Sequence, residues 1–154
     1  MSSIKFSRIL IPIDGSESSM RSVDYAIAIA RGEEPVQIVA LYILFFREES
    51  SIEFVAKLSG TNANFEIPEK TKKEIDQWFN EAKEKANKNF VQLTTDIVIT
   101  DKPVVKSILD YANTKDFDLI VIGRGKNSHL KNLFMGSVTS GIISKSTCPI
   151  MVIK

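Results

Sequence analysis

Apolar runs of strand length alternate along this chain with stretches in which apolar residues recur every three or four positions. The runs cover residues 8–13, 36–46, 118–122 and 150–153, and a run of alternating polar and apolar residues covers 91–99. Continuous apolar runs predict strands buried on both faces, whereas strict alternation predicts a half-exposed strand. Because strands that alternate with helices form parallel sheets under right-handed crossovers, we expect an α/β fold: a single-domain open, mainly parallel five-stranded sheet with helices on both faces.

Four helices are expected between these strands. They start after the turn residues 14–16, at Lys72, after residues 101–103 and at residues 136–138. The helix predicted over 72–90 has the clearest apolar stripe, with Lys and Glu residues on its other face. Trp78 and Phe79 belong to that stripe, and we expect them to pack in the core rather than to contact a ligand.

Residues 47–71 differ from the rest of the chain because they are polar, contain Gly60 and Pro68, and show only a weak apolar period. We expect a long variable loop here, since loops of this length are usually functional or disordered. A chain of 154 residues with 44% hydrophobic residues suits one domain with a single core. The predicted organisation is therefore one domain over residues 1–154 that carries this loop.

Composition excludes several classes of protein. A formal net charge of +1 provides no overall field that would attract nucleic acid or an anionic membrane, and no window approaches the ~20 apolar residues of a membrane span. The single cysteine, Cys148, cannot form an intrachain disulfide, which favours a reducing, cytoplasmic location. The single histidine, His129, cannot build a zinc site of His and Cys ligands. We expect neither nucleic acid nor membrane as a partner.

Ligands of parallel sheets bind at the carboxyl ends of the strands, where the strand order reverses. Two segments fall there: residues 14–16 after the first strand, and the glycine-bearing stretch after Ile122. That stretch lacks the phosphate-loop string G-x-x-x-x-G-K-S/T, and Ser128 stands where a dinucleotide fingerprint starting at Gly123 needs glycine. Neither of these two nucleotide motifs is therefore present.

What remains is Gly123 at the end of a strand, a step of thirteen residues to Gly136, and Ser137 at the start of a helix. This pattern resembles the universal stress protein family, whose nucleotide-binding members show G-x-x-G-x9-G-S/T after the fourth strand. The resemblance covers the whole chain, because ILIPIDGSESS, DKPVVKSILDYA, DFDLIVIGRG and GSVTSGIISKSTCPIMVIK resemble the family's first strand and loop, third helix, fourth strand, and last helix and strand. It implies a Rossmann-like fold of the adenine nucleotide alpha hydrolase-like kind and a role in stress response or signalling.

The resemblance further implies that the protein binds ATP, with Mg or Mn held by the phosphates rather than by a protein cage. The implied nucleotide-binding residues are Pro12, Ile13, Asp14, Tyr42 and Ile122 around the base and ribose, and Gly123, Gly125, Lys126, Gly136, Ser137 and Val138 around the phosphates. The physical basis is that glycines let backbone N–H groups approach a ligand closely and that a helix N-terminus attracts phosphate.

One departure from the family pattern leaves two alternatives open. Lys126 stands at the position of the middle glycine, and Gly125 lies one residue earlier. Either Gly125 provides a positive φ and Lys126 adds a cation near the phosphates, or the loop excludes a triphosphate and the chain serves as a protein-interaction module through residues 47–71. Arg124, together with Lys126 and Lys131, either forms a solvated face or balances a triphosphate.

Asp14 also has two interpretations, since its carboxylate could cap the first helix or contact a ligand, and beside the second loop we favour ligand contact. No residue offers itself as a positioned base, so we expect no enzyme activity beyond slow ATP hydrolysis. The apolar strand 150–153 is expected at a sheet edge, and the resemblance implies a homodimer joined through Ile150–Ile153.

Overall fold

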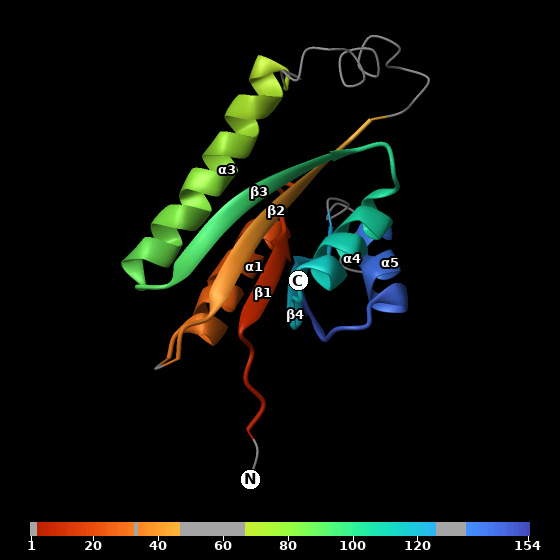
Figure 1. The fold of residues 1–154 in the computed structure, drawn as a ribbon. Coiled ribbons are helices and arrows are strands. Elements are labelled where there is room, and N and C mark those ends of the chain that lie inside the picture. Colours follow the sequence, from red (N-terminus) through yellow and green to blue (C-terminus); the bar gives the residue numbers. More distant parts are fainter. Residues whose placement is uncertain (1–2, 33, 47–66, 126–134) are drawn as a thin grey trace.

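The structure is a computed structural model that describes residues 3–32, 34–46, 67–125 and 135–154. Its elements are, in chain order, β1 (Arg8–Pro12), α1 (Glu17–Ala30), β2 (Gln37–Phe45), α3 (Glu69–Lys88), β3 (Gln92–Thr100), α4 (Val104–Thr114), β4 (Leu119–Gly123), α5 (Ser137–Lys145) and β5 (Ile150–Ile153). Five strands form one sheet in the order β3-β2-β1-β4-β5, and every neighbouring pair is parallel (Figure 1). The predicted α/β fold with an open five-stranded sheet is confirmed, and the sheet is parallel throughout.

Alternate residues of β1 supply the two layers of the core. Ile9 and Ile11 belong to the cluster that the sheet forms with α1 and α3, together with Phe79 of α3. Leu10 belongs to the cluster on the opposite face, where Ile108 of α4 packs. Successive side chains of a strand point to opposite faces, so one apolar run serves both layers. Figure 1 shows α3 on one face of the sheet and α4 with α5 on the other.

The strand β2 is not buried along its whole length, which corrects the expectation of a strand over 36–46 buried on both faces. Ile38, Ala40 and Leu41 are buried, but the residues of β2 after Leu41 are only partly buried. The cause is strand length: β1 ends at Pro12, which pairs with Leu41, so the second half of β2 lacks β1 as a neighbour. This step in the sheet exposes the end of β2 beside the end of β1.

The helix α3 begins at Glu69, before the predicted start at Lys72, so the last residues of the expected loop 47–71 are helical. Pro68 occupies the N-cap position with φ −51°, and its carbonyl oxygen accepts the N–H of Lys72. Proline suits a helix start because its missing N–H has no helical partner there. Residues 47–66 lie outside the described residues. None of the described helices is both long and apolar enough to cross a membrane.

Candidate functional site

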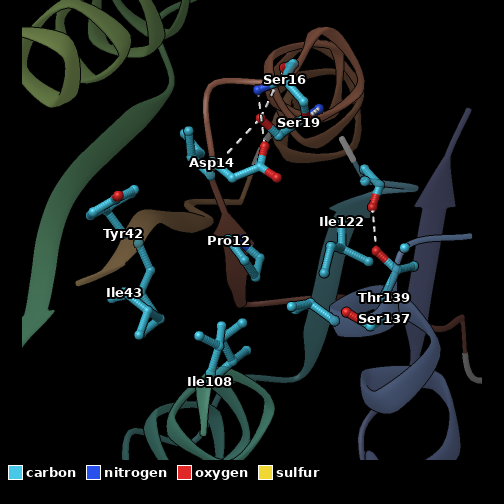
Figure 2. Close-up of a pocket in the computed structure, with 17 residues that line it drawn as sticks. Pro12, Asp14, Ser16, Ser19, Tyr42, Ile43, Ile108, Ile122, Ser137 and Thr139 are labelled. Carbon is cyan, nitrogen blue, oxygen red and sulfur yellow. Dashed lines mark hydrogen bonds between the residues drawn. The ribbon is translucent and has the colours of Figure 1, made fainter. Parts of the chain in front are cut away.

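A cavity opens at the carboxyl ends of β1, β2 and β4, beside the point where the strand order reverses (Figure 2). It measures about 350 Å³ and extends to α4 and to the start of α5. Its lining residues are Pro12, Ile13, Asp14, Ser16, Ser19, Leu41, Tyr42, Ile43, Val104, Ile108, Ile122, Gly123, Gly125, Gly136, Ser137, Val138 and Thr139. The cavity therefore lies where open parallel sheets generally bind ligands.

One end of the cavity is apolar. Leu41 and Ile43 line it from β2, and Val104 and Ile108 line it from α4, with Ile122 on β4. Figure 2 shows Ile43, Ile108 and Ile122 around the same space. These residues belong to, or pack against, the core between the sheet and the helices α4 and α5. A flat ring bound here would be stabilised by roughly 25 cal/mol for each Å² of apolar surface removed from water.

The turn 14–16 borders the polar end of the cavity and is shaped by its own side chains. Ser16 is the N-cap of α1, because its hydroxyl oxygen accepts the N–H of Ser19 at 3.2 Å. Asp14 Oδ1 accepts the N–H of Ser16 at 2.9 Å, so Asp14 shapes the turn and does not cap the helix. Its Oδ2 accepts no hydrogen bond from the residues that the structure describes. One carboxylate oxygen thus remains available to a ligand.

Gly123 ends β4 against the first turn of α1, and its surroundings differ from those expected from the sequence. A Cβ at this position would lie 2.5 Å from the backbone N of Ser19 and 2.6 Å from Oγ of Ser18. Packing against α1, rather than close approach to a ligand, therefore requires glycine here. The buried hydroxyl of Thr139 donates to the Gly123 carbonyl oxygen at 2.7 Å and ties α5 to the same point.

The two ends of the connection between β4 and α5 are held together by a contact between glycine backbones. Gly125 has φ +116°, and a Cβ on it would lie 3.0 Å from the Cα of Gly136. The Gly136 N–H donates to the Arg124 carbonyl oxygen at 2.6 Å, so this amide is not free for a ligand, contrary to the sequence expectation. Gly125 thus has the positive φ that we expected if it takes the place of the middle glycine of the family pattern. Lys126 and the rest of 126–134 lie outside the described residues.

The start of α5 presents amides that have no acceptor among the described residues, at the edge of the cavity. Ser137 is the first helical residue, and Gly136 is an N-cap without a side-chain cap. The described part of the chain offers no acceptor for the N–H groups of Ser137 and Val138. An anion near a helix N-terminus is stabilised by roughly 0.3–1 kcal/mol at an exposed site. This end of the cavity can therefore bind a phosphate or a carboxylate.

Tyr42 lines the cavity from the second half of β2 and lies against α3. Burial raises the pKa of its phenol, and the nearby carboxylates of Glu74 and Asp14 raise this pKa further. The ring packs with Trp78, their centroids being 5.9 Å apart and their planes tilted by 47°. Tyr42 is consequently a neutral phenol at physiological pH and can donate a hydrogen bond.

The described residues expected at the nucleotide site are all brought together by the fold. Pro12, Ile13, Asp14, Tyr42, Ile122, Gly123, Gly125, Gly136, Ser137 and Val138 line the one cavity, and Lys126 is the expected residue that lies outside the described ones. The sequence motifs do not identify the other lining residues, which are Ser16, Ser19, Leu41, Ile43, Val104, Ile108 and Thr139. No motif marks these residues, because most occupy ordinary strand or helix positions. Only the cap at Ser16 has a local signal, the preference for serine at helix starts.

The chain is similar in sequence and in structure to known proteins. A family model described as the universal stress protein family matches residues 5–154. Universal stress protein YxiE of Bacillus subtilis is 31% identical over 154 residues, which span 97% of this chain and 99% of that protein. The solved structure of MJ0577 of Methanocaldococcus jannaschii matches with a TM-score of 0.77 at 23% identity, over 98% of this chain and 97% of that chain.

Several solved structures with this fold hold nucleotides. A universal stress protein of Archaeoglobus fulgidus in complex with dAMP matches with a TM-score of 0.68 at 19% identity, over 98% of this chain and 100% of that chain. Other structures of universal stress proteins with the same fold are complexes with cAMP and with AMP. At these identities the structural likeness establishes the shared fold.

Proposed function

Because this chain belongs to the universal stress protein family, we propose that it binds an adenine nucleotide in the cavity at the carboxyl ends of β1, β2 and β4. The proposal rests on the division of this cavity into an apolar end, lined by Leu41, Ile43 and Ile108, and a polar end, lined by Asp14 and Ser137. A nucleotide has the same division, with a flat base at one end and phosphate at the other. The complexes of related structures with AMP, dAMP and cAMP support this class of ligand.

In the proposed pose the base occupies the apolar end of the cavity, and the phosphate lies at the start of α5. Oδ2 of Asp14 accepts a hydrogen bond from a ribose hydroxyl or from an amino group of the base. The N–H groups of Ser137 and Val138 donate to the phosphate, and the exposed Ser137 hydroxyl adds a further donor. Hydrogen bonds to an ionised phosphate are roughly twice as strong as those between neutral groups.

We extend the proposal to ATP, with Mg or Mn bound through its phosphates. Arg124 directly follows β4, and its guanidinium group forms no ion pair with the residues that the structure describes, so it can balance phosphate charge. In the described ranges, no group of three or more His, Cys, Asp or Glu side chains is arranged to hold a metal ion. In the proposed complex the metal takes its ligands from phosphate oxygens.

The wider role proposed for the protein is that of a cytoplasmic stress-response or signalling module with slow ATP hydrolysis or none. We further propose a homodimer joined through β5 (Ile150–Ile153), an edge strand whose first three residues are only partly buried. An apolar edge strand favours pairing with a second chain. Light scattering at micromolar concentration should give about twice 17.2 kDa, and a mass of one chain would refute the dimer.

Calorimetric titration with AMP and with Mg-ATP tests the nucleotide proposal. We expect both to bind and to raise the melting temperature by roughly 5–10 °C at 100 times Kd. Ser137→Glu should weaken AMP binding about tenfold, a loss of about 1.4 kcal/mol, because it places a carboxylate where the phosphate would bind. Ser137→Gln has a similar size without the charge and should cause a smaller loss. Adenosine carries no phosphate and should bind both variants alike.

Two results would contradict the proposal in different ways. Absence of binding and of a thermal shift at millimolar AMP and ATP would refute nucleotide binding and favour the alternative, a protein-interaction module of the same fold. Equal binding of AMP by Ser137→Glu and by the wild type would mean that the phosphate binds elsewhere.

A further inference from the structure

We propose that Trp78 is a positioning residue for the nucleotide site. From α3, its indole holds the turn 14–16 and Tyr42 in the arrangement that lets Asp14 reach the ligand. This inference rests on the proposed nucleotide binding and adds a residue that does not itself line the nucleotide cavity.

The indole of Trp78 lies directly against the backbone of Gly15. A Cβ built on Gly15 would overlap Cζ2 and Cε2 of the indole and stand 2.7 Å from Cη2. Gly15 also has φ +81°, a backbone conformation that favours glycine. The absence of a side chain at residue 15 thus lets the ring close over the middle of the turn, next to Asp14.

The same indole packs with Tyr42, which lines the nucleotide cavity from the second half of β2. Trp78 is half-buried and packs against the core cluster that contains Ile75 and Phe79 of its own helix. The indole therefore joins three segments that are distant in the sequence: the turn after β1, the end of β2, and α3.

The turn 14–16 separates two cavities, and Trp78 faces the second one. This second cavity measures about 450 Å³ and is lined by Trp78 and Glu74 of α3, among others. Asp14, Ser16 and Gly125 line both cavities, so the turn forms the wall between them. The removal of the indole would leave this wall facing open space on its α3 side.

The Asp14 carboxylate has no direct anchor to a distant part of the described chain. Hydrogen bonds of Asp14 within the described residues reach only Ser16 and Ser19, which belong to the same turn and the first turn of α1. Packing of the Trp78 indole on Gly15 supplies the constraint from outside. A ligand held through Asp14 consequently depends on a residue that it does not touch.

Titration of AMP and of adenosine into Trp78→Ala tests this inference. We expect both ligands to bind about tenfold more weakly, which corresponds to about 1.4 kcal/mol, because the turn contacts the adenosine part that they share. Trp78→Phe keeps a flat ring against Gly15 and should recover most of the affinity. The pattern differs from that of Ser137→Glu, which should weaken AMP and spare adenosine.

Phe79→Leu is the matched control. Phe79 is the next residue on α3, is 6% exposed and lines neither cavity. It should lower the melting temperature and leave both dissociation constants unchanged. Should Trp78→Ala fail to fold, Trp78→Leu takes its place with the same expected loss of affinity.

The outcomes separate the inference from the proposed function. If the wild type binds AMP and the Trp78→Ala or Trp78→Leu variant binds it equally well, the inference is overturned and the proposed function stands. Equal losses of affinity in Phe79→Leu and Trp78→Ala would also overturn it, because affinity would then follow stability. Absence of AMP binding by the wild type would overturn both.

Discussion

Two segments flank the cavity, and different kinds of contact hold them in place. The turn 14–16 is held by side chains, namely the Ser16 cap and the Trp78 indole. The connection between β4 and α5 is held at its described ends by main chain, where Gly125 meets Gly136. Side chains can move to relieve a clash, whereas backbone packed in a dense interior yields little. The cost of added bulk should therefore depend on the Trp78 side chain at the first segment and on main chain alone at the second.

The largest effect is expected for Gly123→Ala, at the start of the second segment. Its Cβ would meet the backbone of α1 at 2.5 Å, and overpacking of this kind should lower the free energy of unfolding by about 3 kcal/mol. Gly32→Ala is the control, since nothing lies within 4 Å of a Cβ there, and it should change stability by less than about 0.5 kcal/mol. Urea unfolding measures both, and a loss below about 1 kcal/mol in Gly123→Ala would show that α1 yields easily.

The next largest effect on stability distinguishes Gly125 from Gly15, although both glycines have a positive φ. Gly125→Ala should cost about 2 kcal/mol, from backbone strain and from contact with the Gly136 backbone. Gly15→Ala should cost a similar amount in the wild type, but about 1 kcal/mol less in a Trp78→Ala background, because the indole that it displaces is then absent. The Trp78→Ala background should leave the cost of Gly125→Ala unchanged. Denaturant unfolding measures how strongly each glycine substitution is coupled to Trp78→Ala. If the coupling free energies of Gly15→Ala and Gly125→Ala are equal, the two segments are not held by different kinds of contact.

A smaller effect is expected from the cap of the first segment. Ser16→Ala removes the acceptor of the Ser19 N–H and should lower the free energy of unfolding by about 1 kcal/mol. Ser16→Asp retains an acceptor at the same position and should restore most of this loss. If the two variants are equally destabilised in thermal melts, the side-chain cap does not stabilise the turn.

The smallest effect concerns the pH dependence of stability at Tyr42, beside the first segment. Burial, followed by Glu74 and Asp14, raises the pKa of Tyr42 above its ordinary value of 10.0, so the folded protein retains a proton that the unfolded chain releases. This contribution to stability is complete below pH 10.0 and is lost as the pH rises from there through the folded pKa. Tyr42→Phe cannot ionise and should therefore lose less stability than the wild type between about pH 9 and 11. Identical pH profiles would show that the phenol is as well solvated in the folded protein as in the unfolded chain.

Much of the fold could be predicted because its signals are local. The apolar run 118–122 predicted a strand that is observed at Leu119–Gly123, and the start signals at residues 136–138 predicted α5. The half-exposed end of β2 could not be predicted, because its burial depends on where β1 ends rather than on its own residues. The start of α3 was placed too late because its first turn is polar and lacks the apolar period.

The residues of the candidate site were predicted in part, but the structure gives a different reason why three of them are glycines. Motif spacing selected Gly123 and Gly136 as glycines that approach a ligand, with Gly125 one residue before the position of the middle glycine, and all three glycines line the cavity. The structure shows that Gly123 is needed for contact with α1, and that a Cβ on Gly125 or on Gly136 would crowd the other glycine at 3.0 or 3.3 Å. Ile108 packs in the core from α4, and nothing in a helical apolar period shows that such a residue also lines a cavity.

The sequence by itself determined the order of strands and helices and the strand ends at which the motif residues gather, because apolar periods and motif spacing are local properties of the chain. Only the tertiary structure decided that Trp78 closes over Gly15. The serine preference gives the Ser16 cap a local signal, but the choice of Ser16 over Asp14 needed the structure of the turn. The cap depends on backbone geometry at the turn, and the indole contact joins segments far apart in the sequence. The packing of helices against the sheet sets those distances, and no local pattern encodes them.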